Sequence, residues 1–173
     1  MNSILDTFIE LHKENNDIIT IWEKSGMLVG VRDDKKKEDL ALSYETIYEY
    51  LVTKKPLNKH DEFWATLLFP IARRVYEKGN LNTIVEASFL VEILKKITLN
   101  DIFTIHFKYI QSRDDIMQTC EDNNFLNIPI FDLEFDKLYE VLKDNYFFYI
   151  DFEAEMTAGI CDYILGNYFN KSV

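Results

Sequence analysis

The chain contains few of the residues that interrupt or cross-link a polypeptide: five glycines, three prolines and two cysteines among 173 residues. So few glycines and prolines argue against disorder and against an all-β fold with many tight turns. The two cysteines, Cys120 and Cys161, lie far apart and form no C-x-x-C motif, which favours two reduced thiols. A chain of this length buries enough surface to fold without a disulfide or a metal ion.

Targeting and membrane signals are also missing. Residues 1–16 lack the basic start, the continuous apolar core and the small-residue cleavage site of a secretory signal peptide. No run of about 18 apolar residues occurs, so the sequence predicts no membrane span. Together with the unpaired cysteines, these absences predict a cytoplasmic protein.

Motifs for catalysis, metal binding and phosphate binding are absent as well. The sequence has no H-E-x-x-H, no phosphate-binding loop, no G-x-G-x-x-G and no G-x-S-x-G. His12 and His106 fall on apolar stripes, which favours a packing role, and no Glu-x-x-His pair marks a di-metal site. A nucleophilic cysteine would need a histidine nearby in space, which the sequence neither shows nor excludes. We predict no catalytic residue, no metal site and no cofactor.

Apolar residues recur at helical spacing along most of the chain. The pattern predicts a mainly α protein, with residues 1–173 forming a single-domain irregular helical bundle of about six to eight helices. A short β-hairpin near residues 18–32 is an option, because β-branched residues flank Lys24-Ser25-Gly26 there. The charged segment 33–39 is predicted to be a loop. Helices are predicted from residue 3, from Ser43, over 60–78, over 82–97, from Thr98, from Ser112, over 132–144 and over about 147–169.

Negative charge is concentrated in the C-terminal third of the chain. The net charge is −11, and residues 114–173 contribute −10 of it, with 13 acidic residues against Lys137, Lys143 and Lys171. A surface of one sign repels nucleic acid and anionic lipid and attracts cationic partners. The charge therefore argues against nucleic-acid and membrane binding. Among the short basic clusters, Arg73-Arg74 is the best candidate for an anion site.

Part of the acidic charge follows a helical repeat. Carboxylates spaced by four residues would form one ridge on the predicted helix 132–144, and the same spacing recurs on the next predicted helix. Tyr139 and the aromatic run 146–149 lie among these acids, as in binding faces that combine aromatic anchors with charge. The predicted partner-binding residues are Asp132, Asp136, Glu140, Asp144, Asp151 and Glu155.

These features predict an acidic, non-enzymatic binding or inhibitor protein that occludes a basic protein partner, as an immunity protein does when it neutralises a toxin. Two alternatives remain open: a helical-bundle enzyme with an unmarked site, and a structural or assembly protein that self-associates through apolar helix faces. Acidity that serves solubility alone, on a solvated face with buried aromatics, is a further alternative. The oligomeric state is not predictable from the sequence.

Overall fold

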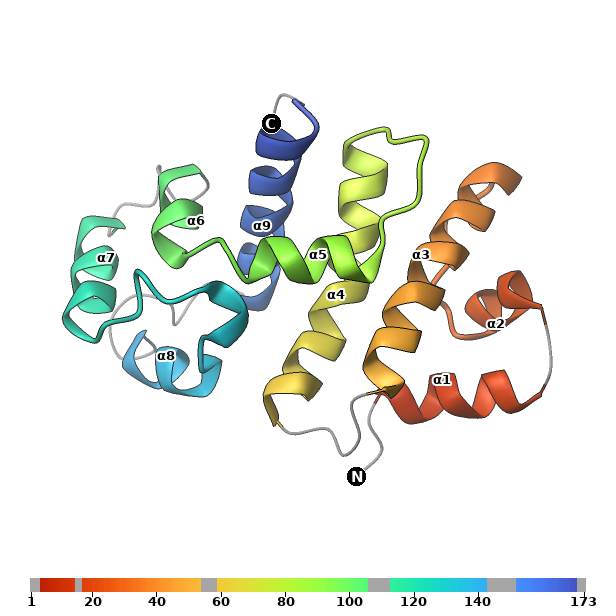
Figure 1. Ribbon diagram of the computed structural model, residues 1–173, viewed down its shortest axis with the longest axis horizontal. Coiled ribbons are helices and arrows are strands. Elements are labelled where there is room, and N and C mark those ends of the chain that lie inside the picture. The colour runs from red at the N-terminus through yellow and green to blue at the C-terminus, as the bar shows by residue number, and fades with distance from the viewer. Residues whose placement is uncertain (1–3, 15–16, 54–58, 106–112, 143–151, 171–173) are drawn as a thin grey trace. The chain divides into compact units, whose positions relative to one another are not determined.

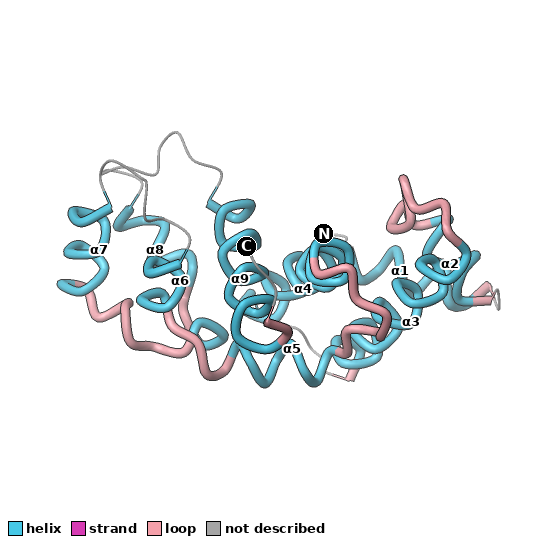
Figure 2. The backbone as a smooth tube through the Cα atoms, turned by 90° about the horizontal axis from the view of Figure 1, so that it is seen from above, coloured by secondary structure: helices cyan, strands magenta, loops and turns pink. Residues whose placement is uncertain are grey.

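The computed structural model describes residues 4–14, 17–53, 59–105, 113–142 and 152–170. These residues contain nine α-helices, one short 3₁₀ helix and no strand, which confirms the mainly α prediction (Figures 1 and 2). The helices are α1 (Ile4–Lys13), α2 (Ile18–Lys24), α3 (Asp34–Val52), α4 (Lys59–Lys78), α5 (Ala87–Leu94), α6 (Leu99–Ile105), α7 (Arg113–Asp122), η1 (Ile130–Asp132), α8 (Phe135–Leu142) and α9 (Phe152–Tyr168).

The chain divides into two compact units, which comprise residues 1–90 and residues 91–173. In the first unit, α3 packs against both α2 and α4, and α1 contacts all three of these helices. In the second unit, α6 packs against α9 and α7 packs against α8. The description of residues 1–173 as one domain stays a prediction.

The optional β-hairpin near residues 18–32 is wrong, because residues 18–24 form helix α2. The Asp17 carboxylate caps this helix by accepting a hydrogen bond of 3.0 Å from the Thr20 backbone N–H. Gly26 ends it in the left-handed region with φ of 81°, and the Met27 N–H donates to the Trp22 carbonyl oxygen. A side-chain cap at one end and a glycine-terminated Schellman motif at the other outweigh the strand preference of the β-branched residues between them.

The predicted loop over residues 33–39 is also wrong, since α3 begins at Asp34 instead of Ser43. The Asp33 carboxylate accepts a hydrogen bond from the Lys36 backbone N–H and so provides the N-cap. The charged residues of the first turn are exposed, so this part of the helix needs no apolar face. Ser43 is instead buried in mid-helix, where its Oγ accepts a hydrogen bond of 2.8 Å from the Val85 N–H.

Helix α4 confirms the prediction for residues 60–78 and continues through Pro70, whose side chain is exposed. After the helix, Asn80 adopts the left-handed conformation with φ of 48°. The Leu81 N–H then donates to the Tyr76 carbonyl oxygen, which completes a Schellman motif. Asparagine tolerates this conformation better than other residues with side chains, so glycine is not required here.

Helix α5 is shorter than the predicted 82–97, although most of the apolar residues in that range are buried, as expected of a core element. Its first residue, Ala87, donates its backbone N–H to Thr46 Oγ1 of α3 at 3.0 Å. Together with the contact between Ser43 and Val85, this bond lets α3 hydroxyls satisfy backbone donors at the start of α5.

The core of the first unit is an aromatic cluster around Trp22, whose exposed fraction is 0%. The ring of Trp22 contacts those of Phe8, Tyr44 and Phe69 at centroid distances of 4.8 to 5.8 Å. Its indole Nε1 donates a hydrogen bond of 3.0 Å to Glu45 Oε1. Aromatic rings from the four helices α1, α2, α3 and α4 therefore meet at one tryptophan.

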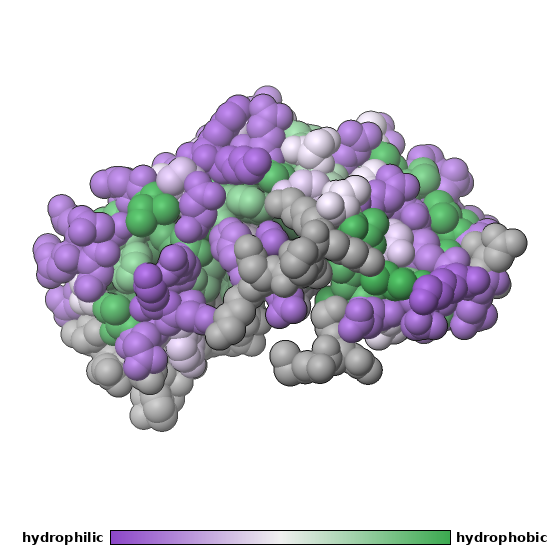
Figure 3. Space-filling model, turned by 60° about the horizontal axis from the view of Figure 1, so that its bottom comes forward, coloured by the Kyte–Doolittle hydropathy of each residue, from purple (hydrophilic) through white to green (hydrophobic). Residues whose placement is uncertain are grey.

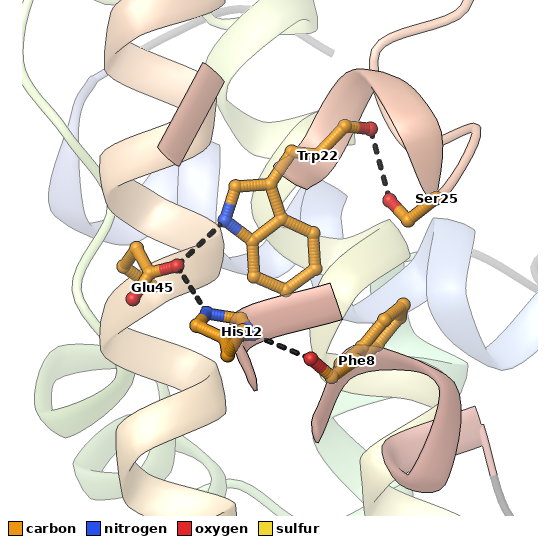
Figure 4. Close-up of polar contacts among 5 residues, drawn as sticks. All are labelled: Phe8, His12, Trp22, Ser25 and Glu45. Carbon is orange, nitrogen blue, oxygen red and sulfur yellow. Dashed lines mark hydrogen bonds and ion pairs between the residues drawn. The ribbon is translucent and has the colours of Figure 1, made fainter. Parts of the chain in front are cut away.

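A polar network borders this cluster and joins α1, α2 and α3 (Figure 4). His12 Nε2 lies 2.6 Å from the same Glu45 oxygen, and His12 Nδ1 lies 2.5 Å from the Phe8 carbonyl oxygen. The imidazole also stacks on the Tyr48 ring with a centroid distance of 3.8 Å. His12 thus has the packing role expected from its place on an apolar stripe, whereas His106 lies outside the described residues.

A buried carboxylate links α3 to α4. Asp39, with 3% of its surface exposed, accepts hydrogen bonds from Tyr76 Oη at 2.6 Å and from Lys35 Nζ at 2.7 Å. Burial alone would raise the pKa of Asp39, but the bonds from Lys35 and Tyr76 outweigh it and hold the pKa below its ordinary value of 3.8. Burial and the bond to Asp39 raise the pKa of Tyr76. The Asp39 carboxylate is therefore stabilised in the folded protein.

Substituting this carboxylate should change how stability depends on pH. At pH 7, Asp39→Asn should lower the free energy of unfolding by about 1–3 kcal/mol, because the amide cannot replace both charge-assisted hydrogen bonds. A lowered pKa stabilises the fold above pH 3.8, and that stability is lost as the pH falls through the lowered pKa. Denaturant unfolding of the two proteins at neutral and acidic pH should therefore show the difference shrinking below pH 3.8. An equal difference at every pH would contradict this assignment.

In the second unit, Thr98 and Asp101 form a capping box at the predicted start of α6. The Thr98 N–H donates to Asp101 Oδ2 at 2.9 Å, and the Asp101 N–H donates to Thr98 Oγ1 at 3.4 Å. An isolated antiparallel bridge pairs Thr98 with Pro129, and the Ile130 N–H donates to the Ile97 carbonyl oxygen at 2.7 Å. These bonds attach the segment after α7 to the start of α6.

Candidate protein-binding surface

Helix α8 has one buried face and one acidic face. Phe135, Leu138 and Leu142 are buried, and their spacing of three and four residues places them on one side of the helix. Asp136 and Glu140 are exposed and lie one turn apart. Of the aromatic residues predicted to accompany these acids, Tyr139 is 50% exposed, so it is not one of the buried aromatics of the solubility alternative.

The predicted ridge of four carboxylates is not a single ridge in the structure. Helix α8 begins at Phe135, so Asp132 lies in the separate helix η1, and the intervening Leu133 is extended with ψ of 132°. Asp144 and Asp151 fall outside the described residues. Glu155 is half-buried on α9. The structure therefore keeps Asp136 and Glu140 on one helix and removes Asp132 from their row, because an extended residue breaks the helical repeat.

Helix α7 supplies acidic residues that the sequence reasoning did not single out as a site. It packs against α8, and the two helices lie side by side in the ribbon and in the backbone tube (Figures 1 and 2). The sequence indicated these residues only through the overall charge of segment 114–173. Which helices lie next to each other depends on tertiary packing, which residue spacing does not reveal. The acidic surface of α7, η1 and α8 comprises the exposed residues Asp114, Asp115, Glu121, Asp122, Asp132, Glu134, Asp136 and Glu140.

Two lysines lie on or beside this acidic surface: Lys137 on α8, and Lys95, whose Nζ lies 5.6 Å from the centroid of the Phe131 ring in η1. Lys137 is the one basic residue of segment 114–173 within the part of the chain that the structure describes. Its Nζ pairs with Glu134 Oε2 at 2.6 Å, and both side chains are well exposed. An exposed pair of this kind contributes about 0–1 kcal/mol to stability, so it neutralises one carboxylate without making the surface important for folding.

Hydrophilic side chains make up most of the described surface on the face drawn in Figure 3, and apolar residues form smaller patches between them. The exposed large apolar side chains belong to separate elements, with Val29 in the turn after α2 and Tyr139 on α8. Tyr139 is the member of this group that lies on the acidic surface, between Asp136 and Glu140 in the chain. The acidic surface therefore combines charge with one exposed aromatic ring.

Two sequence-based candidates for other sites have structural roles. Arg73 donates to the carbonyl oxygens of Met27 and Val29 at 3.2 and 2.6 Å, and it pairs with Glu77. Its guanidinium thus holds the turn after α2, which argues against an anion site at Arg73, whereas Arg74 is exposed. Cys120 is buried, and burial raises the pKa of its thiol to about 12. A thiol with so high a pKa supplies almost no nucleophilic thiolate at neutral pH.

No group of three or more His, Cys, Asp or Glu residues suited to a metal ion occurs among the described residues. Within the same residues, no helix is both long enough and apolar enough to cross a membrane. Comparisons of the chain with protein-family models, curated proteins and solved structures found no match.

Proposed function

We propose that this chain is a non-enzymatic binding protein whose acidic surface occludes a basic protein in the cytoplasm. Within this class, we propose an immunity protein that neutralises a basic toxin. The observation that carries the proposal is the acidic surface itself: eight exposed carboxylates on α7, on η1, on α8 and at Glu134 between the last two, against the two lysines Lys137 and Lys95.

Charge of one sign on packed helices is suited to fast and selective association. Such a field steers a basic partner toward the surface and raises the association rate, and it repels nucleic acid and acidic proteins. Charge alone adds little net affinity, because paired charges must lose water when they meet. The exposed ring of Tyr139 would supply affinity that charge does not, since tyrosine provides contact area at a low cost in side-chain entropy.

Affinity capture from cells of the source organism tests this proposal. The immobilised protein should retain a basic protein at low salt and release it near about 1 M salt, where the Debye length falls to about 3 Å. The variant Asp136→Lys/Glu140→Lys should capture much less of it. Glu49→Lys/Glu62→Lys is the matched control, because it changes the net charge equally at exposed positions of α3 and α4.

The contrast between the two variants decides the outcome. Loss of capture with the α8 variant and retention with the control would support a specific acidic binding surface. Equal loss with both variants would mean that net charge alone attracts the protein, and retention with both would contradict the proposal.

A further inference from the structure

A pocket opens on the acidic surface where α7 ends and the chain turns toward η1. Its volume is about 500 Å³, and its lining comes from one short segment of the chain, Glu121 to Ile128. Glu121, Asn124 and Asn127 provide polar groups, and Leu126 and Ile128 provide apolar surface. The pocket thus combines an acidic and amide rim with aliphatic walls, in the unit that carries most of the protein's negative charge.

Backbone hydrogen bonds fix the segment that forms this pocket. Asn124 adopts the left-handed conformation with φ of 63°, and the Phe125 N–H donates to the Cys120 carbonyl oxygen at 2.8 Å. This Schellman motif sets the direction in which the chain leaves α7. The Leu126 carbonyl oxygen then accepts a hydrogen bond from the Asn100 N–H of α6 at 3.3 Å. Because the backbone of the lining is held in place before binding, a ligand would have to order only the side chains that contact it.

The polar groups of the pocket differ from their neighbours in having no side-chain partner. Asp122 accepts a hydrogen bond from Gln118, and Asn123 donates to the Thr119 carbonyl oxygen, so these side chains are occupied locally. In the part of the chain that the structure describes, no hydrogen bond or ion pair engages the side chains of Glu121, Asn124 and Asn127. One carboxylate and two carboxamide oxygens therefore remain available as acceptors around the pocket.

We propose that this pocket receives a lysine or arginine side chain of the basic partner. Such a side chain has an aliphatic stem, which would contact Leu126 and Ile128, and a cationic head with several N–H donors. The head would donate to the Glu121 carboxylate and to the amide oxygens of Asn124 and Asn127. This inference rests on the proposed function and deepens it, because it locates the anchor point within the acidic surface.

An NMR titration with N-acetyl-arginine amide and N-acetyl-lysine amide tests the pocket without the partner. Backbone signals of residues 121–128 should shift, whereas N-acetyl-norleucine amide, which has the stem without the charge, should leave them unchanged. Glu121→Gln should weaken binding of the cationic probes about tenfold or more, because it removes a charge-assisted hydrogen bond. Asp136→Asn removes the same charge outside the pocket, and it should weaken their binding less than about twofold.

The same two variants are then compared with the captured partner. Glu121→Gln should raise the dissociation rate of the partner about tenfold or more, whereas Asp136→Asn should act by slowing association and leave the dissociation rate unchanged. Equal increases in dissociation rate with both variants, or probe shifts spread over α8, would overturn the proposed pocket without contradicting the role of the acidic surface. Probe binding without any effect of Glu121→Gln on partner affinity would mean that the pocket takes a small free cation, such as a polyamine, and would also overturn it. Failure of the proposed function would appear separately, as the absence of any salt-dependent basic partner.

Discussion

Association between the Asp136→Lys/Glu140→Lys variant and the basic partner should be about ten to a hundred times slower than association with the unmodified protein at low salt. The two residues are exposed on α8 and lie one turn apart, so reversing them creates a local positive field within the acidic surface. Electrostatic steering raises association rates by about tenfold to a thousandfold, and the change would remove or invert it. Stopped-flow association kinetics at several salt concentrations would measure this effect.

The salt dependence distinguishes steering from loss of contacts. In the unmodified protein the association rate should fall steeply as salt rises, and in the variant this dependence should flatten or reverse. The Glu49→Lys/Glu62→Lys control should keep most of the dependence, because its substitutions lie on α3 and α4. If the α8 variant and the control have the same association rates, the acidic surface does not guide binding.

The largest loss of stability is expected for Trp22→Ala. Trp22 is fully buried at the meeting point of Phe8, Tyr44 and Phe69, so its removal would leave a large cavity. Large-to-small substitutions of buried aromatic residues cost about 3–5 kcal/mol. The same change would remove the indole donor to Glu45, which connects the core to His12. The free energy of unfolding from denaturant titration would measure the loss.

A second substitution keeps this prediction testable if Trp22→Ala does not fold. Trp22→Phe retains a ring in the cluster and removes the indole N–H, so it should cost about 1–3 kcal/mol. A loss below about 0.5 kcal/mol for both variants would mean that the aromatic cluster does not hold α1, α2, α3 and α4 together.

Much of the fold was predictable because local signals and burial agree. The apolar rows of residues 60–78 form α4, and the Thr98–Asp101 capping box begins α6 as expected. Predictions failed where end-capping decided the structure. Residues 18–24 have a strand-like composition, yet the Asp17 cap and the left-handed Gly26 make them a helix. The charged residues after Asp33 suggested a loop, but they form the first turn of α3. Charged residues are compatible with a helix there because this turn is exposed to solvent.

The candidate site was predictable only in part. Periodicity identified Asp136 and Glu140 as neighbours, and the structure confirms that they share α8. Periodicity also placed Asp132 in their row, because nothing in the sequence marks Leu133 as the extended residue that separates η1 from α8. The acids of α7 join the surface through packing between helices, and sequence spacing carries no information on such packing. The role of all these residues in binding a partner stays a prediction.

Hydrogen–deuterium exchange of the protein with and without its captured partner tests the central claim most directly. If the acidic surface is the binding surface, the partner should slow exchange in peptides that cover α7, residues 123–129, η1 and α8. Peptides that cover α2 and α3 should exchange at the same rate in the complex and in the isolated protein. Slower exchange confined to α2 and α3, with no change in α7 or α8, would contradict the proposed function.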